Sequence, residues 1–222
     1  MNEIKRPSRA RAPEKKAEQF NRIIETGKDL FVKYGSHGFS LRALARKLKM
    51  SQSNLYNYVK SKRELWIAIR IKYYSEFQKG FTKIALKYGE NYIDLWVEMA
   101  NYFLGFAAAD SKRFEMMFFV RAPPSEKRGE YEKKFKPLRI MEQGINILKQ
   151  SVKENKFKGE NPTEFFYYMY GACMGAAKVE ADLKINLNII EPIKIKSNLL
   201  DIVEFRQFFL KEFRERLERA FT

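Results

Sequence analysis

The stretch FSLRALARKLKMSQSNLYNYVKSKREL, residues 39–65, decides the fold. Ser40 can cap a short helix over residues 41–48, in which leucine and alanine recur at the three- and four-residue spacing of an inward face. Ser51 can cap a second short helix, residues 52–58, which a leucine anchors to the interior. Two short helices joined by a tight turn predict a helix-turn-helix.

Serine and amide side chains gather at the start of the second short helix. Such groups can reach base edges in a DNA groove, and a glutamine or asparagine can pair bidentately with adenine. Basic and aromatic side chains around them can contact phosphates. The predicted base contacts are Ser51, Gln52, Ser53 and Asn54, and the predicted phosphate contacts are Arg42, Tyr56, Asn57, Tyr58, Lys60 and Lys62.

Two alternatives stay open for these residues. Tyr56 and Tyr58 also fit a packed aromatic core. Lys60, Lys62 and Arg63 also fit a helix start that is merely solvated.

The positive charge of the chain is concentrated in its first part. The 222 residues carry a formal net charge of +16, from 43 Lys and Arg against 27 Asp and Glu. Residues 1–80 hold 19 of the cations and 7 of the anions, a net of +12, and residues 81–222 hold 24 and 20, a net of +4. This distribution indicates that the first part binds a polyanion, with a solubilising surface as the alternative.

Histidine and cysteine each occur once, as His37 and Cys173. These counts exclude a multi-histidine metal site, an intrachain disulfide and a cysteine zinc cluster. There is no nucleophile–base pair, glycine-rich phosphate loop or metal-ligand spacing, so we expect no enzyme, no metal and no cofactor. No apolar run approaches the ~18 residues of a membrane span. We therefore expect a cytoplasmic protein without a membrane partner.

The rest of the chain has helical periodicity. A helix over 13–34, stopped by Gly35, precedes the two short helices, and Ser61 with Glu64 forms a capping box that opens a longer one. Because nothing alternates with period two for long, the expected class is all-α, with about nine or ten helices. Residues 81–88 are expected to be the tail of the helix that opens at the capping box or a short helix of their own. Further helices are expected at 91–109, 111–120, 135–157 with a candidate kink at Pro137, 163–183 and 199–221, with a loop at 121–134 and an undecided conformation at 185–198.

This pattern resembles the DNA-binding region of tetracycline-repressor (TetR) family regulators over about residues 14–70. The residues that fall in the family's register, besides the first-helix pattern, are Gly38, Ser40, Ala45, Leu55, Tyr56 and Lys62. Three positions depart from it. Lys49 stands at the usual turn glycine and would adopt a left-handed conformation at a cost of roughly 1 kcal/mol. Asn57-Tyr58 replaces a Tyr-His pair, and Val59 replaces a phenylalanine.

The resemblance implies an N-terminal three-helix helix-turn-helix DNA-binding domain followed by a C-terminal helical ligand-binding and dimerisation domain. It also places Ser40 and Arg42 near phosphates. The expected divisions are a basic flexible tail at 1–12, the DNA-binding domain at 13–60, a connecting helix at 61–80, and an effector-binding and dimerisation domain at 81–222. The tail either reaches neighbouring DNA or is only a solubilising terminus.

In this family such a chain is a homodimeric transcriptional regulator, usually a repressor. It would leave a palindromic double-stranded DNA operator when a small, largely apolar effector binds. A nonspecific architectural, nucleoid-type DNA-binding protein is the alternative function, and a membrane-surface module is a third.

Two further sets of residues are candidates for the effector pocket and the dimer interface. Met and aromatic side chains make adaptable apolar walls, although ordinary core packing has the same spacing. The pocket candidates are Trp96, Met99, Phe103, Phe106, Met117, Phe118, Met141, Tyr170 and Met174. Small residues at four-residue spacing and a phenylalanine stripe on the last helix suggest a close helix–helix contact, within or between subunits. The dimer candidates are Gly171, Gly175, Phe205, Phe209 and Phe213.

Overall fold

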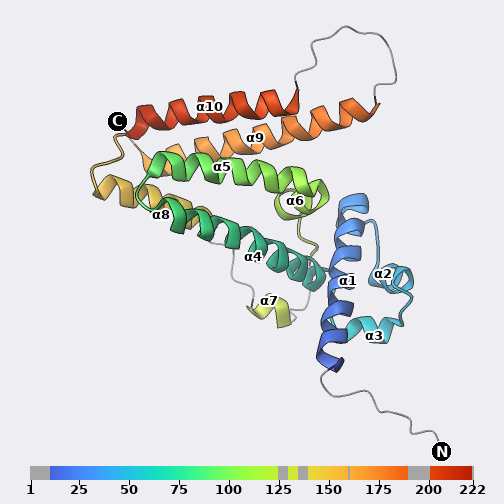
Figure 1. Cartoon of the computed structure of the whole chain (residues 1–222). Coiled ribbons are helices and arrows are strands. Elements are labelled where there is room, and N and C mark those ends of the chain that lie inside the picture. Colours follow the sequence, from blue (N-terminus) through green and yellow to red (C-terminus); the bar gives the residue numbers. More distant parts are fainter. Residues whose placement is uncertain (1–10, 125–129, 135–139, 160, 190–200, 222) are drawn as a thin grey trace, which may run out of the picture. The chain divides into compact units, whose positions relative to one another are not determined.

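A computed structural model describes residues 11–124, 130–134, 140–159, 161–189 and 201–221. All regular structure in these residues is helical, in ten helices (Figure 1). The chain forms two compact units. Unit 1 comprises residues 1–74 and 112–136, and unit 2 comprises residues 75–111 and 137–222. The all-α prediction is therefore confirmed, while the predicted functional domain boundaries stay predictions.

Four helices come first along the chain, and serine caps explain where the two short ones begin. They are α1 (Arg11–Tyr34), α2 (Leu41–Lys47), α3 (Gln52–Tyr56) and α4 (Lys62–Tyr88). The hydroxyl of Ser40 accepts the amide of Ala43, and the hydroxyl of Ser51 accepts the amide of Asn54, each at 3.1 Å. Both bonds satisfy an amide that the first turn of a helix leaves free.

Apolar contacts between α1 and α4 form the core of unit 1. Ile23, Ile24, Leu65 and Ile69 are at most 1% exposed. Gly27 of α1 lets the two helices approach closely, because a Cβ there would stand 3.0 Å from both methyl carbons of Leu65. A larger side chain at this position would push the connecting helix away from α1.

Glycine also shapes the turn that leads from α1 to α2. Gly35 has φ +65°, and its amide donates to the carbonyl of Phe31 at 2.8 Å, which closes the last turn of α1. At Gly38 a Cβ would lie 2.2 Å from the carbonyl oxygen of Tyr34. The turn therefore requires glycine at this second position for space, in agreement with the register predicted from the sequence.

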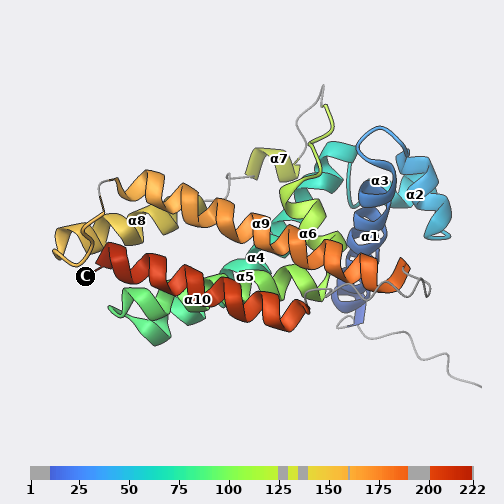
Figure 2. The ribbon, with the colours of Figure 1, turned by 90° about the horizontal axis from the view of Figure 1, so that it is seen from above.

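Unit 2 is a packed set of helices around α5 (Tyr92–Ala109). The helix α5 packs against α9 (Pro162–Ile189) and α10 (Ile202–Phe221), and α8 (Ile140–Lys153) packs against α9. Figure 2 shows α9 and α10 running side by side. Two ion pairs fasten α10: Arg206 donates two hydrogen bonds to the carboxylate of Glu180 in α9, and Arg214 lies 2.5 Å from Asp94 in α5.

Several predicted bounds need correction. Helix α4 runs unbroken to Tyr88, so residues 81–88 are its tail, as one of the two predicted alternatives had it, and not a separate helix. The predicted loop at 121–134 contains a short helix, α7 (Glu130–Lys134), after α6 (Ser111–Phe118). Helix α9 extends to Ile189, which puts part of the undecided segment 185–198 in a helix, while residues 190–198 lie outside the described residues. The candidate kink at Pro137 and residues 1–10 of the predicted tail also lie outside them, whereas residues 11 and 12 of that tail belong to α1.

Replacing Lys49 by glycine should raise the free energy of unfolding by about 1 kcal/mol. Lys49 has φ 54°, where a Cβ is strained and glycine is not. Urea denaturation measures the change, with Lys47→Gly as the control because Lys47 ends α2 without a positive φ, so glycine there relieves no strain. A Lys49→Gly protein no more stable than the wild type would contradict strain at this turn.

Candidate nucleic-acid interface

The polar start of α3 is presented to solvent while its other face is locked into unit 1. Ser51, Gln52, Ser53 and Asn54 are all exposed, whereas Leu55 is fully buried. Val59, in the turn after α3, is fully buried as well. This short helix therefore has a fixed back and a free polar front, which is what reading base edges in a groove requires.

The predicted phosphate contacts fall into exposed and half-buried groups. Exposed side chains are free to reach a phosphate, whereas half-buried ones also pack within unit 1. The exposed residues are Ser40, Arg42, Asn57 and Lys60, and the half-buried residues are Tyr56, Tyr58 and Lys62.

Tyr56 keeps its hydroxyl near the polar front of α3. The amide nitrogen of Gln52 donates to this hydroxyl at 3.4 Å, and the Lys60 ammonium donates to the carbonyl of Tyr56 at 2.5 Å. Both are local contacts of exposed groups, which exchange readily for DNA contacts. Tyr56 therefore contacts both Gln52, a candidate for base contact, and Lys60, a candidate for phosphate contact.

Tyr58 has a packing role that the sequence left open. Its ring stacks on Phe20 of α1, with ring centroids 6.2 Å apart and an interplanar angle of 11°. A stacked aromatic pair contributes about 0.5–1.5 kcal/mol beyond burial. The aromatic-core alternative thus has support at Tyr58, and any phosphate contact has to be made by the part of the ring that remains accessible.

Lys62 likewise has structural partners. Its ammonium donates to the carbonyls of Ser36 at 2.6 Å and Phe39 at 2.9 Å, and it lies 5.3 Å from the centre of the Phe39 ring. Lys62 therefore ties α4 to the loop between α1 and α2. The solvated-helix-start alternative does not describe it, and its predicted phosphate contact stays a prediction.

The structure also adds basic residues that sequence reasoning missed. Arg46 and Lys47 of α2 and Lys49 of the turn are exposed and follow Arg42 along the same short segment. The signal was their spacing: cations at 42, 46 and 49 recur every three to four residues on an otherwise apolar helix.

Glu25 shows how firmly α1 is joined to α4 beside this surface. Its carboxylate lies 2.9 Å from the Lys72 ammonium and 3.1 Å from that of Lys28. Burial alone raises the pKa of Glu25, but hydrogen bonds from Lys72, Tyr73 and Lys28 outweigh burial and lower this pKa to about 2.

The predicted effector-pocket residues belong to both units, and the pocket stays a prediction. Met117 and Phe118 belong to unit 1, where Met117 is fully buried and its carbonyl accepts the hydroxyl of Tyr74 at 3.1 Å. The others belong to unit 2, where Trp96 lies against Phe166 at 5.9 Å between ring centroids. The residues of this set in unit 2 are Trp96, Met99, Phe103, Phe106, Met141, Tyr170 and Met174.

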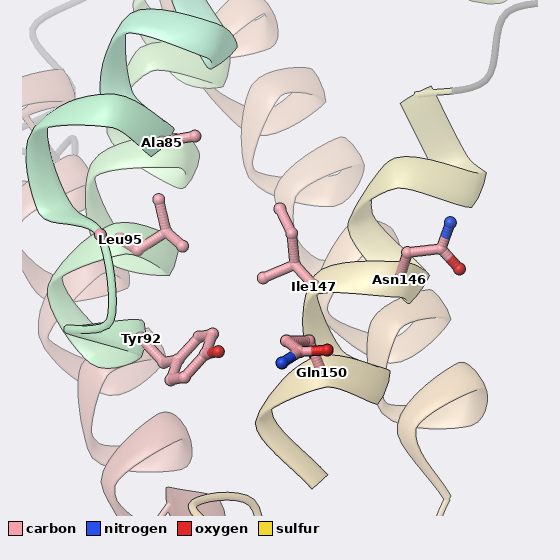
Figure 3. A pocket seen from close by; sticks show the side chains of 7 residues that line it. Ala85, Tyr92, Leu95, Asn146, Ile147 and Gln150 are labelled. Atoms are coloured by element: carbon pink, nitrogen blue, oxygen red, sulfur yellow. The ribbon is translucent and has the colours of Figure 1, made fainter. Parts of the chain in front are cut away.

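A hollow in unit 2 has a different lining. It has a volume of about 340 Å³ and lies between the end of α4, the start of α5, and α8 (Figure 3). The side chains of Leu95 and Ile147 face each other across it. Its lining is Ala85, Gly89, Tyr92, Leu95, Asn146, Ile147 and Gln150, none of which the sequence singled out.

The predicted dimer residues differ in how far they are exposed. Gly171 and Gly175 are exposed, and no described atom lies within 4 Å of a Cβ built on either glycine. Phe213, by contrast, is buried within the chain at 5.6 Å from Phe209, so assigning it to a dimer interface was wrong. Phe205 and Phe209 are half-buried, while the exposed phenylalanine of α10 is Phe208, which sequence analysis missed.

The remaining titratable candidates have no visible chemical role. His37 is exposed in the loop after α1, and burial raises the pKa of the Cys173 thiol to about 12. In the described ranges, no three histidine, cysteine or carboxylate side chains gather as a metal site would need. Across those same ranges, no helix is long and apolar enough to cross a membrane.

The helix geometry and the exposed front of α3 together make a helix-turn-helix of the kind that can read base edges. Known proteins share this part of the chain. Residues 23–69 match the family described as bacterial regulatory proteins, tetR family. HTH-type transcriptional regulators of Mycobacterium bovis and Mycobacterium tuberculosis are each 27% identical over 117 residues, covering 49% of this chain. The chain thus spans about half the length of the curated relatives it matches.

Solved structures of the same fold cover nearly the whole chain. A tetR-family regulator from Shewanella superposes with a TM-score of 0.61 at 18% identity, over 89% of this chain and 97% of that one. AibR, solved with isovaleryl coenzyme A and operator DNA, gives 0.62 at 15% identity, over 87% and 97%. Residues 23–69 therefore match a TetR-type DNA-binding domain, and the chain shares the fold of these solved structures.

Removing the Lys62 ammonium should loosen the helix-turn-helix. We expect Lys62→Met to lower the free energy of unfolding by roughly 1–3 kcal/mol, because two loop carbonyls lose a charged donor. Lys60→Met is the control, since Lys60 is exposed and bonds only a carbonyl of its own turn. Chemical denaturation gives both values, and equal stability of the two variants would contradict the assigned role of Lys62.

Proposed function

We propose that the protein is a homodimeric repressor that binds a palindromic operator and is released from it by a small, largely apolar effector. The observation that carries this proposal is the exposed polar front of α3 on a buried back. In each subunit Ser51 to Asn54 would enter a major groove, and the exposed cations of α2 would contact phosphates on either side. Two subunits would place their α3 helices in grooves about 34–36 Å apart or a multiple of it.

The exposed apolar stripe of unit 2 supports the dimer. Tyr167, Tyr168 and Val179 are 53%, 60% and 39% exposed, and they lie on one side of α9 with Gly171 and Gly175. Helix α10 adds Val203 and Phe208, 62% and 61% exposed. Large apolar side chains gathered in this way on the surface mark an interaction site, and glycines within the stripe allow a second helix to come close.

A buried donor in unit 2 supports an effector with a hydrogen-bond acceptor. Trp96 is only 7% exposed, and across the described ranges its indole N–H has no hydrogen-bond partner. Such a group costs about 1–3 kcal/mol when it is left unsatisfied. An effector that brings a carbonyl or carboxylate oxygen to Trp96 would recover this cost, and the rings of Phe166 and Tyr170 would face its apolar part.

AibR, which has the same fold, was solved with isovaleryl coenzyme A and operator DNA, and this supports an effector of the same class. The effector would act by population shift. The effector would favour the subunit arrangement in which the spacing of the two α3 helices does not match the operator. DNA affinity could then fall at most by the ratio of the effector's affinities for the two arrangements.

The operator itself is the first test. Selection from random duplex DNA at about 150 mM salt, where nonspecific phosphate binding is weak, should enrich a palindrome with half-sites about 10 bp apart or a multiple of that. A pool that stays random would instead favour the nonspecific architectural alternative.

The same selected site tests the role of α3. Tyr56→Ala should lower operator affinity at least about tenfold with the thermal midpoint unchanged, because the ring contributes binding contacts and is only half-buried. Tyr34→Ala is the matched control, since Tyr34 is 48% exposed in the same unit but lies outside the helix-turn-helix. If Tyr56→Ala bound like wild type, the assigned DNA-reading surface would be wrong.

The dimer has its own test. Phe208→Glu should convert a dimer into a monomer in sedimentation, because it replaces an exposed apolar side chain of α10 by a charge. Leu86→Glu is the control, since Leu86 is 81% exposed on α4, outside the stripe. A Phe208→Glu protein that stays dimeric would contradict the assigned interface.

A further inference from the structure

A short stretch after α6 is fastened to the helix-turn-helix unit by three successive hydrogen bonds. The carbonyl of Val120 accepts the indole N–H of Trp66 at 3.1 Å, and that of Pro123 accepts Arg63 at 3.0 Å. Between them the carbonyl of Arg121 accepts the hydroxyl of Ser36. We call residues 120–123 and α7 together the brace. All of its residues belong to unit 1.

The helix α7 adds contacts at the start of α4. The guanidinium of Arg63 lies 2.6 Å from the carboxylate of Glu132. The next residue, Glu64, is 1% exposed, and its carboxylate accepts the amide of Tyr131 at 3.2 Å. The other oxygen of Glu64 accepts the amide of Lys60 at 2.7 Å. One buried carboxylate therefore joins α7 to the turn that ends the recognition helix α3.

An aromatic stack makes a second connection to the same turn. The ring of Phe20 lies between Tyr131 of α7 and Tyr58 of the turn, with centroids 5.8 Å and 6.2 Å away. The interplanar angles are 8° and 11°, so the three rings are nearly parallel. Burial, with the nearby Glu64 carboxylate, raises the pKa of Tyr131, as expected for a ring held against the protein.

We propose that the brace is a positioning element for DNA binding: α7, through Tyr131 and Glu132, holds the turn at residues 57–60 and thereby sets the orientation of the recognition helix. Both ends of the brace continue along the chain into unit 2, at residues 111 and 137. The brace is thus a covalent route by which the state of unit 2 can reach α3. The DNA-affinity consequence rests on the proposed function, while the positioning itself does not.

Releasing α7 would have a specific physical effect. Glu64 would keep its bond to Lys60 but lose the Tyr131 amide, and Phe20 would lose one of its two stacked neighbours. The turn would remain covalently intact and would become looser, since buried polar groups that lose a partner favour local opening.

Amide hydrogen exchange tests the positioning without any DNA. In Tyr131→Ala we expect exchange in residues 57–61 to accelerate about tenfold or more, while the amides of the α1 core at Ile23 and Ile24 stay protected. Glu132→Gln, which only weakens the Arg63 contact, should produce a smaller change in the same residues. Lys133→Ala is the matched control, because its side chain is 62% exposed on the same helix.

Unchanged exchange in residues 57–61 would overturn the proposal, and so would a uniform acceleration over all of unit 1, which would mean plain destabilisation. If Tyr131→Ala does not fold, exchange in residues 57–61 of Tyr131→Leu and Glu132→Gln is compared with that of Lys133→Ala instead. On the selected operator, Tyr131→Ala should also bind about tenfold more weakly than Lys133→Ala. Failure of wild type to select an operator would contradict the proposed function and leave the exchange result standing.

Discussion

The buried carboxylate of Glu64 is the constraint on which the helix-turn-helix unit depends. At the first turn of α4 it is 1% exposed and accepts amides from two other segments. A carboxylate in such a place is costly unless its oxygens are bonded, and here each oxygen has an amide donor. It is placed there by Ser61, whose hydroxyl caps α4 by accepting the amide of Glu64 at 3.0 Å. The capping box seen in the sequence is a variant, because Glu64 bonds the amide of Lys60 instead of that of Ser61.

The Glu64 contact also helps to fix the orientation of α3, the proposed DNA-reading helix. The helix α3 has only five residues and cannot be stable by itself. Its orientation comes from Leu55 and Val59 in the core, the caps at Ser51 and Ser61, and the Glu64 contact after its last turn. A rigid support of this kind lets exposed polar side chains meet base edges without a further ordering cost.

Local chemistry made much of unit 1 predictable from sequence. The caps at Ser40 and Ser51 depend on neighbouring residues alone, and the structure has both. The left-handed Lys49, which was expected from the family resemblance, is present too. Contacts between residues far apart in the sequence could not be predicted. Nothing near Lys62 shows that its ammonium bonds carbonyls of residues 36 and 39, and residues 130–134 have too few apolar positions to indicate a packed helix.

Unit 2 shows a different limit of sequence reasoning. Helical spacing placed Phe205, Phe209 and Phe213 on one stripe of α10, but periodicity does not say whether a stripe faces its own chain or a partner. In the structure Phe213 is buried and Phe208, on another side of the helix, is exposed. The effector set stays a prediction that spans both units, since Met117 and Phe118 belong to unit 1 and its other members to unit 2.

The most direct test of the central claim, that the front of α3 reads base edges, is the base preference of Gln52→Ala along the selected operator. Measured one base pair at a time against wild type, this variant should lose discrimination at one or two symmetric positions by about 1–3 kcal/mol and keep it elsewhere. Arg42→Ala, a phosphate-contact control, should bind all sequences more weakly by a similar factor. A Gln52→Ala protein with an unchanged preference at every position would contradict the claim.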